Sequence, residues 1–136
     1  MAKVLGIDYG LKRVGLAFAD MEAKFPVPFT TLSNNDDLFE RLKQIVASED
    51  VDTVVVGLPR SLEGEETAQT KLAAAFAKEL QAELGVPVEM VDEAGTSEAA
   101  IDRLGAKKAR GKEKGLVDQE AAVIILEDYL NEYDTA

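Results

Sequence analysis

The sequence predicts an α/β fold with a mixed five-stranded sheet, antiparallel on one side and parallel on the other, flanked by helices. Three observations support this expectation. Strand patterns follow one another closely near the N-terminus, strand and helix patterns alternate from residue 36 onward, and 136 residues suit one compact domain. We therefore expect residues 1–136 to form a single domain with the element order β-β-β-α-β-α-β-α-α.

The first three strands are expected to form an antiparallel meander. Residues 3–9 and 13–18 are mostly apolar, and the short gap that contains Gly10 indicates a hairpin between them. The third strand is expected at 27–32, in a region with two prolines that would place it on an edge of the sheet.

The remaining chain alternates between helix and strand. Apolar and β-branched runs predict strands at 53–56 and 86–91, and Gly57-Leu58-Pro59 ends the first of them. Apolar residues at helical spacing predict four helices, over 36–48, 64–84, 96–104 and 117–131. Thr96 is a candidate cap for the third helix, and 105–115, rich in glycine and basic residues, is expected to be a loop.

Two residue types are absent from the chain, and their absence narrows its chemistry. The chain has no cysteine, which excludes disulfides, zinc fingers, iron–sulfur sites and thiol nucleophiles. It has no histidine, which excludes Ser-His-Asp triads and histidine bases. Any catalysis must therefore use carboxylates, hydroxyls, lysine, arginine or a bound metal ion.

The charge is strongly acidic but unevenly spread. The 15 basic and 26 acidic residues give a net charge of −11, which argues against a protein that binds phosphate backbones through its overall charge. The basic residues gather in one short stretch, which comprises Lys107, Lys108, Arg110, Lys112 and Lys114. We expect the side chains of this cluster to bind nucleic-acid phosphates beside a functional site. The alternative is a run of charged residues that contacts only solvent. Lys12 and Arg13, in the first hairpin, are further candidates for substrate contact.

The sequence contains no membrane signal. No apolar run approaches the roughly 18 residues of a membrane span, and Asp8 interrupts the apolar N-terminus that a signal peptide would need. We expect a soluble, cytoplasmic protein with no membrane partner, either a monomer or a weak homodimer. Four acids near the C-terminus are expected to be solvated, namely Glu127, Asp128, Glu132 and Asp134.

Three carboxylates stand where a negative charge is costly. Asp8 ends an apolar strand, and Glu93 follows the strand at 86–91. Asp118 shares a helical stripe with Ala122 and Ile125 that should face the sheet, and it is expected at a helix N-terminus, where the macrodipole favours an anion. If the strands before Asp8 and Glu93 are parallel neighbours, their carboxyl ends meet at the edge where open α/β sheets bind ligands.

Three inward carboxylates at one edge would repel one another unless a cation neutralised them. Oxygen-only ligands suit Mg²⁺ or Mn²⁺, and two such ions about 3.5–4 Å apart can cleave phosphodiesters by activating water and stabilising the leaving oxygen. Asp8, Glu93 and Asp118 are therefore the candidate catalytic and metal-binding residues. Taken singly, each acid also fits a structural role as a turn cap, a solvated strand end or a helix cap.

Four segments of the chain form a recognisable series. They are Gly6-Ile7-Asp8-Tyr9-Gly10-Leu11-Lys12-Arg13-Val14-Gly15, Val55-Val56-Gly57-Leu58-Pro59, Asp92-Glu93 with Thr96-Ser97-Glu98-Ala99, and Val117-Asp118-Gln119-Glu120-Ala121-Ala122. In this order and spacing they resemble the YqgF/RuvX family, known as Holliday junction resolvases and as pre-16S rRNA 5′-end nucleases. The resemblance covers essentially the whole chain.

The resemblance implies an RNase H-like fold and a divalent-metal nuclease whose acidic cluster is Asp8, Glu93 and Asp118. It also implies a cytoplasmic role in ribosomal RNA maturation. The chain departs from the family pattern mildly at Ser97, where the family has threonine, and at two positions that are usually basic. Ala94 stands where the family usually has arginine, and Gln119 stands where lysine is frequent, which reduces the positive charge beside a phosphate site.

Other functions remain open alongside a nuclease for precursor rRNA. The same chemistry suits a Holliday junction resolvase that cuts branched DNA. A non-catalytic nucleic-acid-binding module is a further alternative, because similar domains occur inside larger proteins. Asp8-Tyr9-Gly10 followed by Gly15 also resembles the first phosphate loop of the actin and sugar-kinase ATPases, although those proteins need two domains to clamp a nucleotide.

Overall fold

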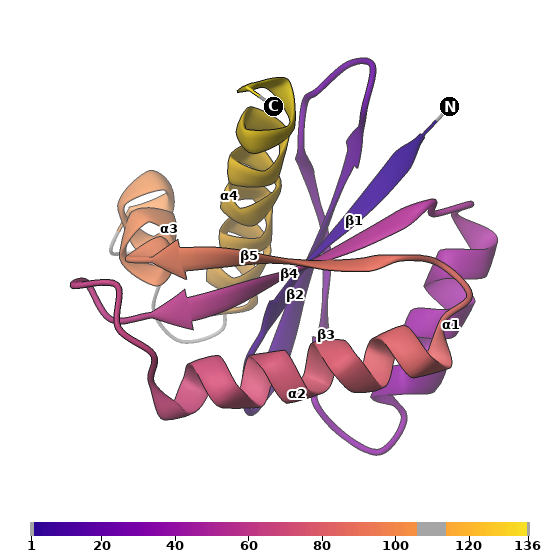
Figure 1. Cartoon of the computed structure of the whole chain (residues 1–136), viewed down its shortest axis with the longest axis horizontal. Helices are drawn as coiled ribbons and strands as arrows, with labels where there is room; N and C mark the ends of the chain where they lie inside the picture. Colours follow the sequence, from indigo (N-terminus) through magenta and orange to yellow (C-terminus); the bar gives the residue numbers. More distant parts are fainter. Residues whose placement is uncertain (1, 106–113, 136) are drawn as a thin grey trace.

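The sheet has five strands in the order β3-β2-β1-β4-β5 (Figure 1). The computed structural model describes residues 2–105 and 114–135. Its strands are β1 (Lys3–Tyr9), β2 (Arg13–Asp20), β3 (Val27–Ser33), β4 (Thr53–Arg60) and β5 (Val88–Ala94). β1 pairs antiparallel with β2 and parallel with β4, and β4 pairs parallel with β5. The predicted mixed sheet is therefore confirmed, and β3 lies at an edge as its prolines indicated.

Helices cover both faces of the sheet, and Figure 1 shows α2 and α4 on opposite sides of the strands. The described helices are α1 (Leu38–Ser48), α2 (Ala68–Glu83), α3 (Thr96–Leu104) and α4 (Lys114–Thr135). On one face, Leu5 and Ile7 of β1 pack with residues of α1 and α2 such as Leu42 and Leu80. On the other face, Val4 and its neighbours pack against α4, and α3 packs on α4 in turn.

Two glycines inside strands let α4 lie very close to the sheet. A Cβ atom at Gly15 would stand 2.1 Å from the carbonyl oxygen of Asp118, and one at Gly57 would stand 2.4 Å from Cδ1 of Ile125. Glycine in a strand interior normally weakens the strand, and it is found where another part of the chain approaches closely. Here the two glycines allow α4 to bring Asp118 against the sheet.

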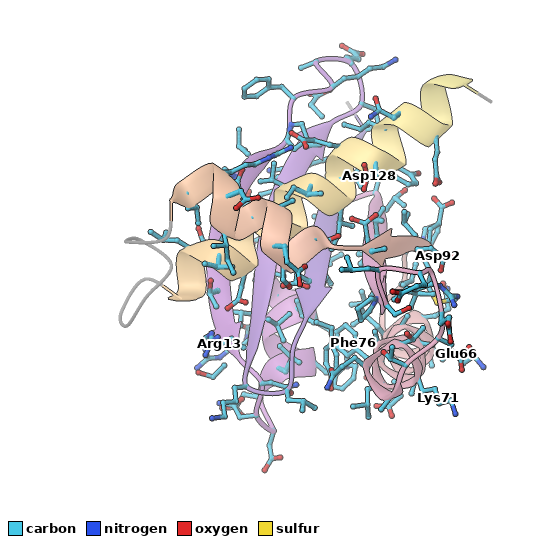
Figure 2. All side chains as sticks on the ribbon, turned by 90° about the vertical axis from the view of Figure 1, so that its left-hand side faces the viewer. Arg13, Glu66, Lys71, Phe76, Asp92 and Asp128 are labelled. Atoms are coloured by element: carbon cyan, nitrogen blue, oxygen red, sulfur yellow. The ribbon has the colours of Figure 1, made fainter. Side chains whose placement is uncertain are left out.

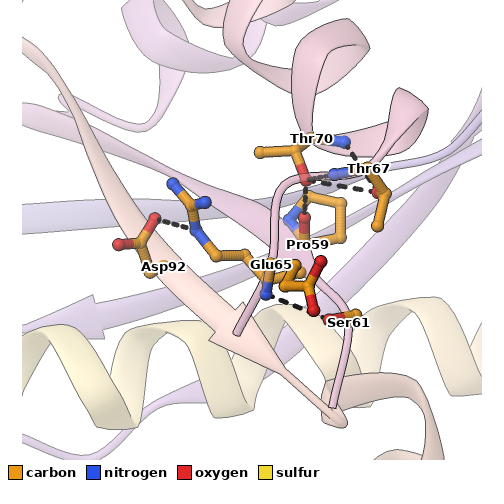
Figure 3. Close-up of polar contacts among 7 residues, drawn as sticks. Pro59, Ser61, Glu65, Thr67, Thr70 and Asp92 are labelled. Atoms are coloured by element: carbon orange, nitrogen blue, oxygen red, sulfur yellow. Dashed lines mark hydrogen bonds and ion pairs between the residues drawn. The ribbon is translucent and has the colours of Figure 1, made fainter. Parts of the chain in front are cut away.

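The helix predicted over 64–84 begins later, at Ala68. Gly64 has a φ of +83°, which a helix cannot continue through, and Thr67 forms a capping box with Thr70. The Thr70 hydroxyl also donates a hydrogen bond to the carbonyl oxygen of Pro59 (Figure 3). These contacts tie the start of α2 to the end of β4.

Other element boundaries also differ from the sequence-based expectations. β4 continues to Arg60 rather than ending at residue 56, and β5 runs over Val88–Ala94 rather than 86–91, since residues 57–60 pair with 91–94. α4 begins at Lys114 and ends at Thr135, so the last two residues of the predicted loop 105–115 are helical. Within the described part of the chain, no helix is both long and apolar enough to cross a membrane.

Candidate active site

Asp8 and Glu93 line one cavity at the carboxyl ends of parallel strands. Asp8 lies near the end of β1 and Glu93 near the end of β5, on either side of β4. Asp8 lies on the same face of β1 as Val4, and Glu93 on the same face of β5 as Val91, so both acids face α4. Their cavity has a volume of about 180 Å³, and its other lining residues include Gly57, Arg60, Thr96 and Ile125.

Asp8 is a half-buried carboxyl beside a second carboxylate. Burial disfavours its charged form, and the nearby Asp118 carboxylate repels it. Together these effects raise the pKa of Asp8 to about 7. The side chain is therefore poised to exchange a proton, or to accept a cation in its place, near neutral pH.

Glu93 is the one acidic residue among the described residues that is buried, at 6% exposure. Burial is the largest cause that raises the pKa of Glu93, to about 8, and a hydrogen bond with the Asp128 carboxyl of α4 adds to it. The Thr96 hydroxyl opposes this rise because it donates a hydrogen bond of 2.9 Å to Glu93 Oε1. Thr96 therefore does not cap α3 through its side chain as expected; Gly95 holds the cap position with a φ of +71°.

Asp118 lies beside Asp8 but is already neutralised by a cation. Arg13 Nε of β2 donates a hydrogen bond of 2.7 Å to Asp118 Oδ2. The expected stripe is confirmed, since Ala122 and Ile125 below Asp118 are buried against the sheet. The expected placement at the helix N-terminus is wrong, because α4 begins at Lys114 and Asp118 stands in its second turn. The guanidinium, rather than the helix dipole, offsets the charge.

The donor chemistry of this site fits a hard divalent cation. Asp8 and Glu93 offer only oxygen donors, and each has a raised pKa because burial and neighbouring carboxyl groups disfavour its charged form. The three carboxylates are nevertheless not assembled as a finished site. Across residues 2–105 and 114–135, no group of three or more acidic side chains stands ready to hold a metal ion. Arg13 occupies the position at Asp118 that a cation would share.

The structure describes some of the basic residues that were predicted to contact nucleic acid, but not others. Arg13 pairs with Asp118, whereas Lys12 is exposed at the hairpin turn. Lys107, Lys108, Arg110 and Lys112 lie outside the described residues, and for Lys114 only the backbone is described.

Sequence reasoning missed two residues of the site. Asp128 was expected to be solvated in an acidic tail, but it is half-buried and shares a hydrogen bond with Glu93. Helical spacing could have indicated this, because Asp128 lies one turn from Ile125, which lines the same cavity. Arg60 also lines the cavity, because β4 continues four residues beyond its predicted end.

Comparisons with known proteins indicate the family and the fold of the chain. A family model described as "RuvX: Holliday junction resolvase" matches residues 2–132. A protein of Maridesulfovibrio salexigens named "Putative pre-16S rRNA nuclease" is 41% identical over 134 residues, which cover 94% of this chain and 97% of the relative. A protein of Synechocystis with the same name is 38% identical over 130 residues, covering 93% of this chain and 86% of that one.

Solved structures show the same fold at low sequence identity. RuvC of Thermus thermophilus matches with a TM-score of 0.60 at 15% identity, over 98% of this chain and 96% of that one. T. thermophilus RuvC in complex with a Holliday junction substrate matches with a TM-score of 0.57 at 14% identity, over the same shares of both chains. The expected RNase H-like architecture is therefore confirmed as a RuvC-like fold.

Proposed function

The chain belongs to the RuvX family of Holliday junction resolvases, and we propose that it is a divalent-metal-dependent nuclease that matures the 5′ end of precursor 16S rRNA. The observation that supports this proposal is the pair of inward acids, Asp8 and Glu93, which line one cavity and whose pKa values are both raised by burial. We further propose that residues 1–136 form one nuclease domain and that the protein acts in the cytoplasm.

The proposed metal ligands are Asp8, Glu93 and Asp118, and the cofactor is Mg²⁺ or Mn²⁺. Such ions, when bound, activate water and offset the charge that develops on phosphate oxygens. The residues of the chain have preparatory roles. Thr96 orients Glu93 through its hydroxyl, and Arg13 fixes the position of the Asp118 side chain until a metal ion binds. Gly57 lines the cavity and lets Ile125 of α4 pack closely against β4 beside Glu93.

The choice of RNA as substrate rests on the relatives. Proteins that are about 40% identical over more than 90% of this chain bear the name of a pre-16S rRNA nuclease. Branched DNA is the second candidate substrate, favoured by the description of the family model as a resolvase. A resolvase is expected to act as a dimer, because a four-way junction has two-fold symmetry and needs paired cuts.

The test compares two labelled substrates, a precursor 16S rRNA 5′ segment and a synthetic four-way DNA junction, in Mg²⁺, Mn²⁺ or chelator. Asp8→Asn and Glu93→Gln are expected to abolish cleavage. Asp102→Asn, at an exposed position of α3, is the matched control and should cleave like the wild type. Metal-dependent cutting of RNA would support the proposal, and paired cuts confined to the junction would favour the resolvase. Binding without cutting by the wild type would leave a non-catalytic module.

A further inference from the structure

We propose that Arg60, Lys71 and Lys78 form a basic track that leads from the carboxylate cavity onto α2 and binds the nucleic-acid backbone beside the cleavage position. The inference rests on the proposed function, since the ligand of the track is the phosphodiester backbone of the same substrate. These three residues lie on β4 and α2, and they are not among the residues that the sequence predicted to contact nucleic acid.

Adjoining hollows connect the track to the cavity. A hollow of about 290 Å³ runs along α2 and is lined by all three basic residues together with Glu66. Arg60 also lines the cavity that holds Asp8 and Glu93, and it borders a third hollow with Glu93. Arg60 therefore stands at the rim where the hollows meet. A chain that leaves the carboxylates across the end of β4 would pass over it.

The backbone of Arg60 is fixed from two sides. Its Cα pairs with Ala94 of β5, and an isolated bridge joins it to Glu66. The side chain is directed by one contact, a hydrogen bond of 2.9 Å from Nε to Asp92 Oδ1, which Figure 3 draws as the dashed line at Asp92. An arginine has five N–H donors, so this contact leaves Nη1 and Nη2 to bind a phosphate.

The two lysines are exposed and lack a partner among the described residues. Most other described cations lack this freedom, since carboxylates pair with Lys3, Arg13, Lys43 and Arg103. Figure 2 shows Lys71 with Glu66 and Asp92 on one side of the molecule, away from Arg13. The hollow along α2 is thus lined by two lysines and by Arg60, which also pairs with Asp92, against the single carboxylate of Glu66, on a chain whose net charge is −11.

The spacing of the track suits a nucleic-acid strand. Lys71 and Lys78 are seven residues apart on α2, which corresponds to about 10 Å along the helix axis. A strand of a duplex advances about 3.4 Å per phosphate, so this distance covers about three phosphates. Ala74 and Ala75 lie between the lysines in the hollow, and their small side chains leave room for a backbone to approach.

The experiment measures binding of a fluorescent single-stranded RNA of mixed sequence by anisotropy, in chelator, from 50 to 300 mM salt. The test variants are Lys71→Gln with Lys78→Gln, and Arg60→Gln alone. The matched control is Arg41→Gln with Lys43→Gln on α1, which removes the same charge from two residues that do not line the hollow. Thermal unfolding of each variant checks that it folds, and glutamine is a good helix former at these positions.

We expect the double variant on α2 to bind about tenfold more weakly at 0.1 M salt, with a slope of log K against log salt reduced by about 1.4. Arg60→Gln should lower the slope by about 0.7, and the control should match the wild type. If the wild type binds RNA and the α2 and Arg60 variants bind it as tightly as the control does, the proposed basic track is rejected. The proposed nuclease function is unaffected by that result. If the folded wild type binds neither RNA nor a four-way junction, the proposed function fails and the track fails with it.

Discussion

Arg13 Nε lies 2.7 Å from Asp118 Oδ2, so a cation from the second strand holds a candidate catalytic acid of the last helix. These two residues are 105 positions apart in the sequence. The Asp118 side chain is 18% exposed and that of Arg13 is 40% exposed, so water screens the pair only partly. The guanidinium offsets part of the charge of Asp118, although the Asp118 carboxylate still raises the pKa of Asp8. A divalent cation shared by the same acids would compete with it.

Arg13→Gln is expected to have opposite effects in the absence and in the presence of metal. In chelator at pH 8, the loss of the counter-charge should lower the free energy of unfolding by about 1 kcal/mol. In Mg²⁺, Asp118 is free to bind the ion, so the Mg²⁺ concentration at half-maximal stabilisation should fall several-fold. Thermal unfolding across a Mg²⁺ titration measures both effects, with Arg41→Gln as the control. An unchanged or raised Mg²⁺ midpoint would show that Arg13 does not compete with the ion.

The stability of the metal-free protein is expected to decrease as the pH rises. The pKa values of Asp8 and Glu93 in the folded protein, about 7 and about 8, lie above those of an unfolded chain, which are roughly 3.9 and 4.3. Between pH 4 and pH 8 the native state therefore holds more protons than the unfolded state, so the free energy of unfolding falls through this range. Chemical denaturation at intervals from pH 5 to pH 8.5 measures the fall, which saturating Mg²⁺ should reduce.

Asp8→Asn removes one of these two titrations. A pKa displaced by one pH unit corresponds to about 1.4 kcal/mol, so the displacement of the Asp8 pKa by about three units should make the variant more stable than the wild type by about 4 kcal/mol at pH 8.5. The difference between the two proteins should be smaller at pH 5. Asp102→Asn, at an exposed position, should follow the wild-type profile. If the free energy of unfolding of Asp8→Asn changed with pH in parallel with that of the wild type, the pKa of Asp8 in the folded protein would not be raised.

Gly15→Ala is expected to displace α4 from the sheet. The added Cβ would stand 2.1 Å from the Asp118 carbonyl oxygen and 2.8 Å from Asp118 Cβ, so the backbone of α4 must move. We expect a loss of about 3 kcal/mol in the free energy of unfolding and the loss of metal-induced stabilisation. Gly85→Ala is the matched control, since its Cβ would meet nothing within 4 Å. Equal stability of the two variants would show that α4 can shift without cost.

Patterns within single elements predicted most of this fold. Apolar periodicity placed all five strands, and the prolines of β3 indicated an edge. The errors arose where a contact between distant segments decides a boundary. Residues 57–60 extend β4 because they pair with 91–94, which no local pattern in the sequence indicates. Leu72 illustrates the same limit. Its helical spacing from Phe76 and Leu80 predicts that Leu72 faces inward, yet it is 42% exposed. The buried residues of α2 are Thr70, Ala73, Phe76, Ala77 and Leu80.

Some acids of the site could likewise be identified from local sequence patterns, whereas one depends on contacts between distant segments. Asp8, Glu93 and Asp118 could be selected from the sequence because each stands on an apolar face or at a strand end. Asp128 could not be selected in this way, since the segment around it is rich in acidic residues, which is typical of a solvent-exposed surface. Its contact with Glu93 depends on how α4 lies across the end of β5. Glu127 pairs with Arg103 of α3 for the same reason. The composition of a segment does not reveal which acids tertiary packing turns inward.

Asp128→Asn tests whether this contact restrains the site. The Asp128 carboxyl raises the pKa of Glu93 through a hydrogen bond and through its charge, after the larger effect of burial. The amide keeps the size of the side chain and removes the charge, so the pKa of Glu93 should fall and its carboxylate should be available at lower pH. At pH 7 the Mg²⁺ midpoint for thermal stabilisation should therefore fall several-fold, while Asp102→Asn leaves it unchanged. A raised midpoint would instead identify Asp128 as a ligand of the ion.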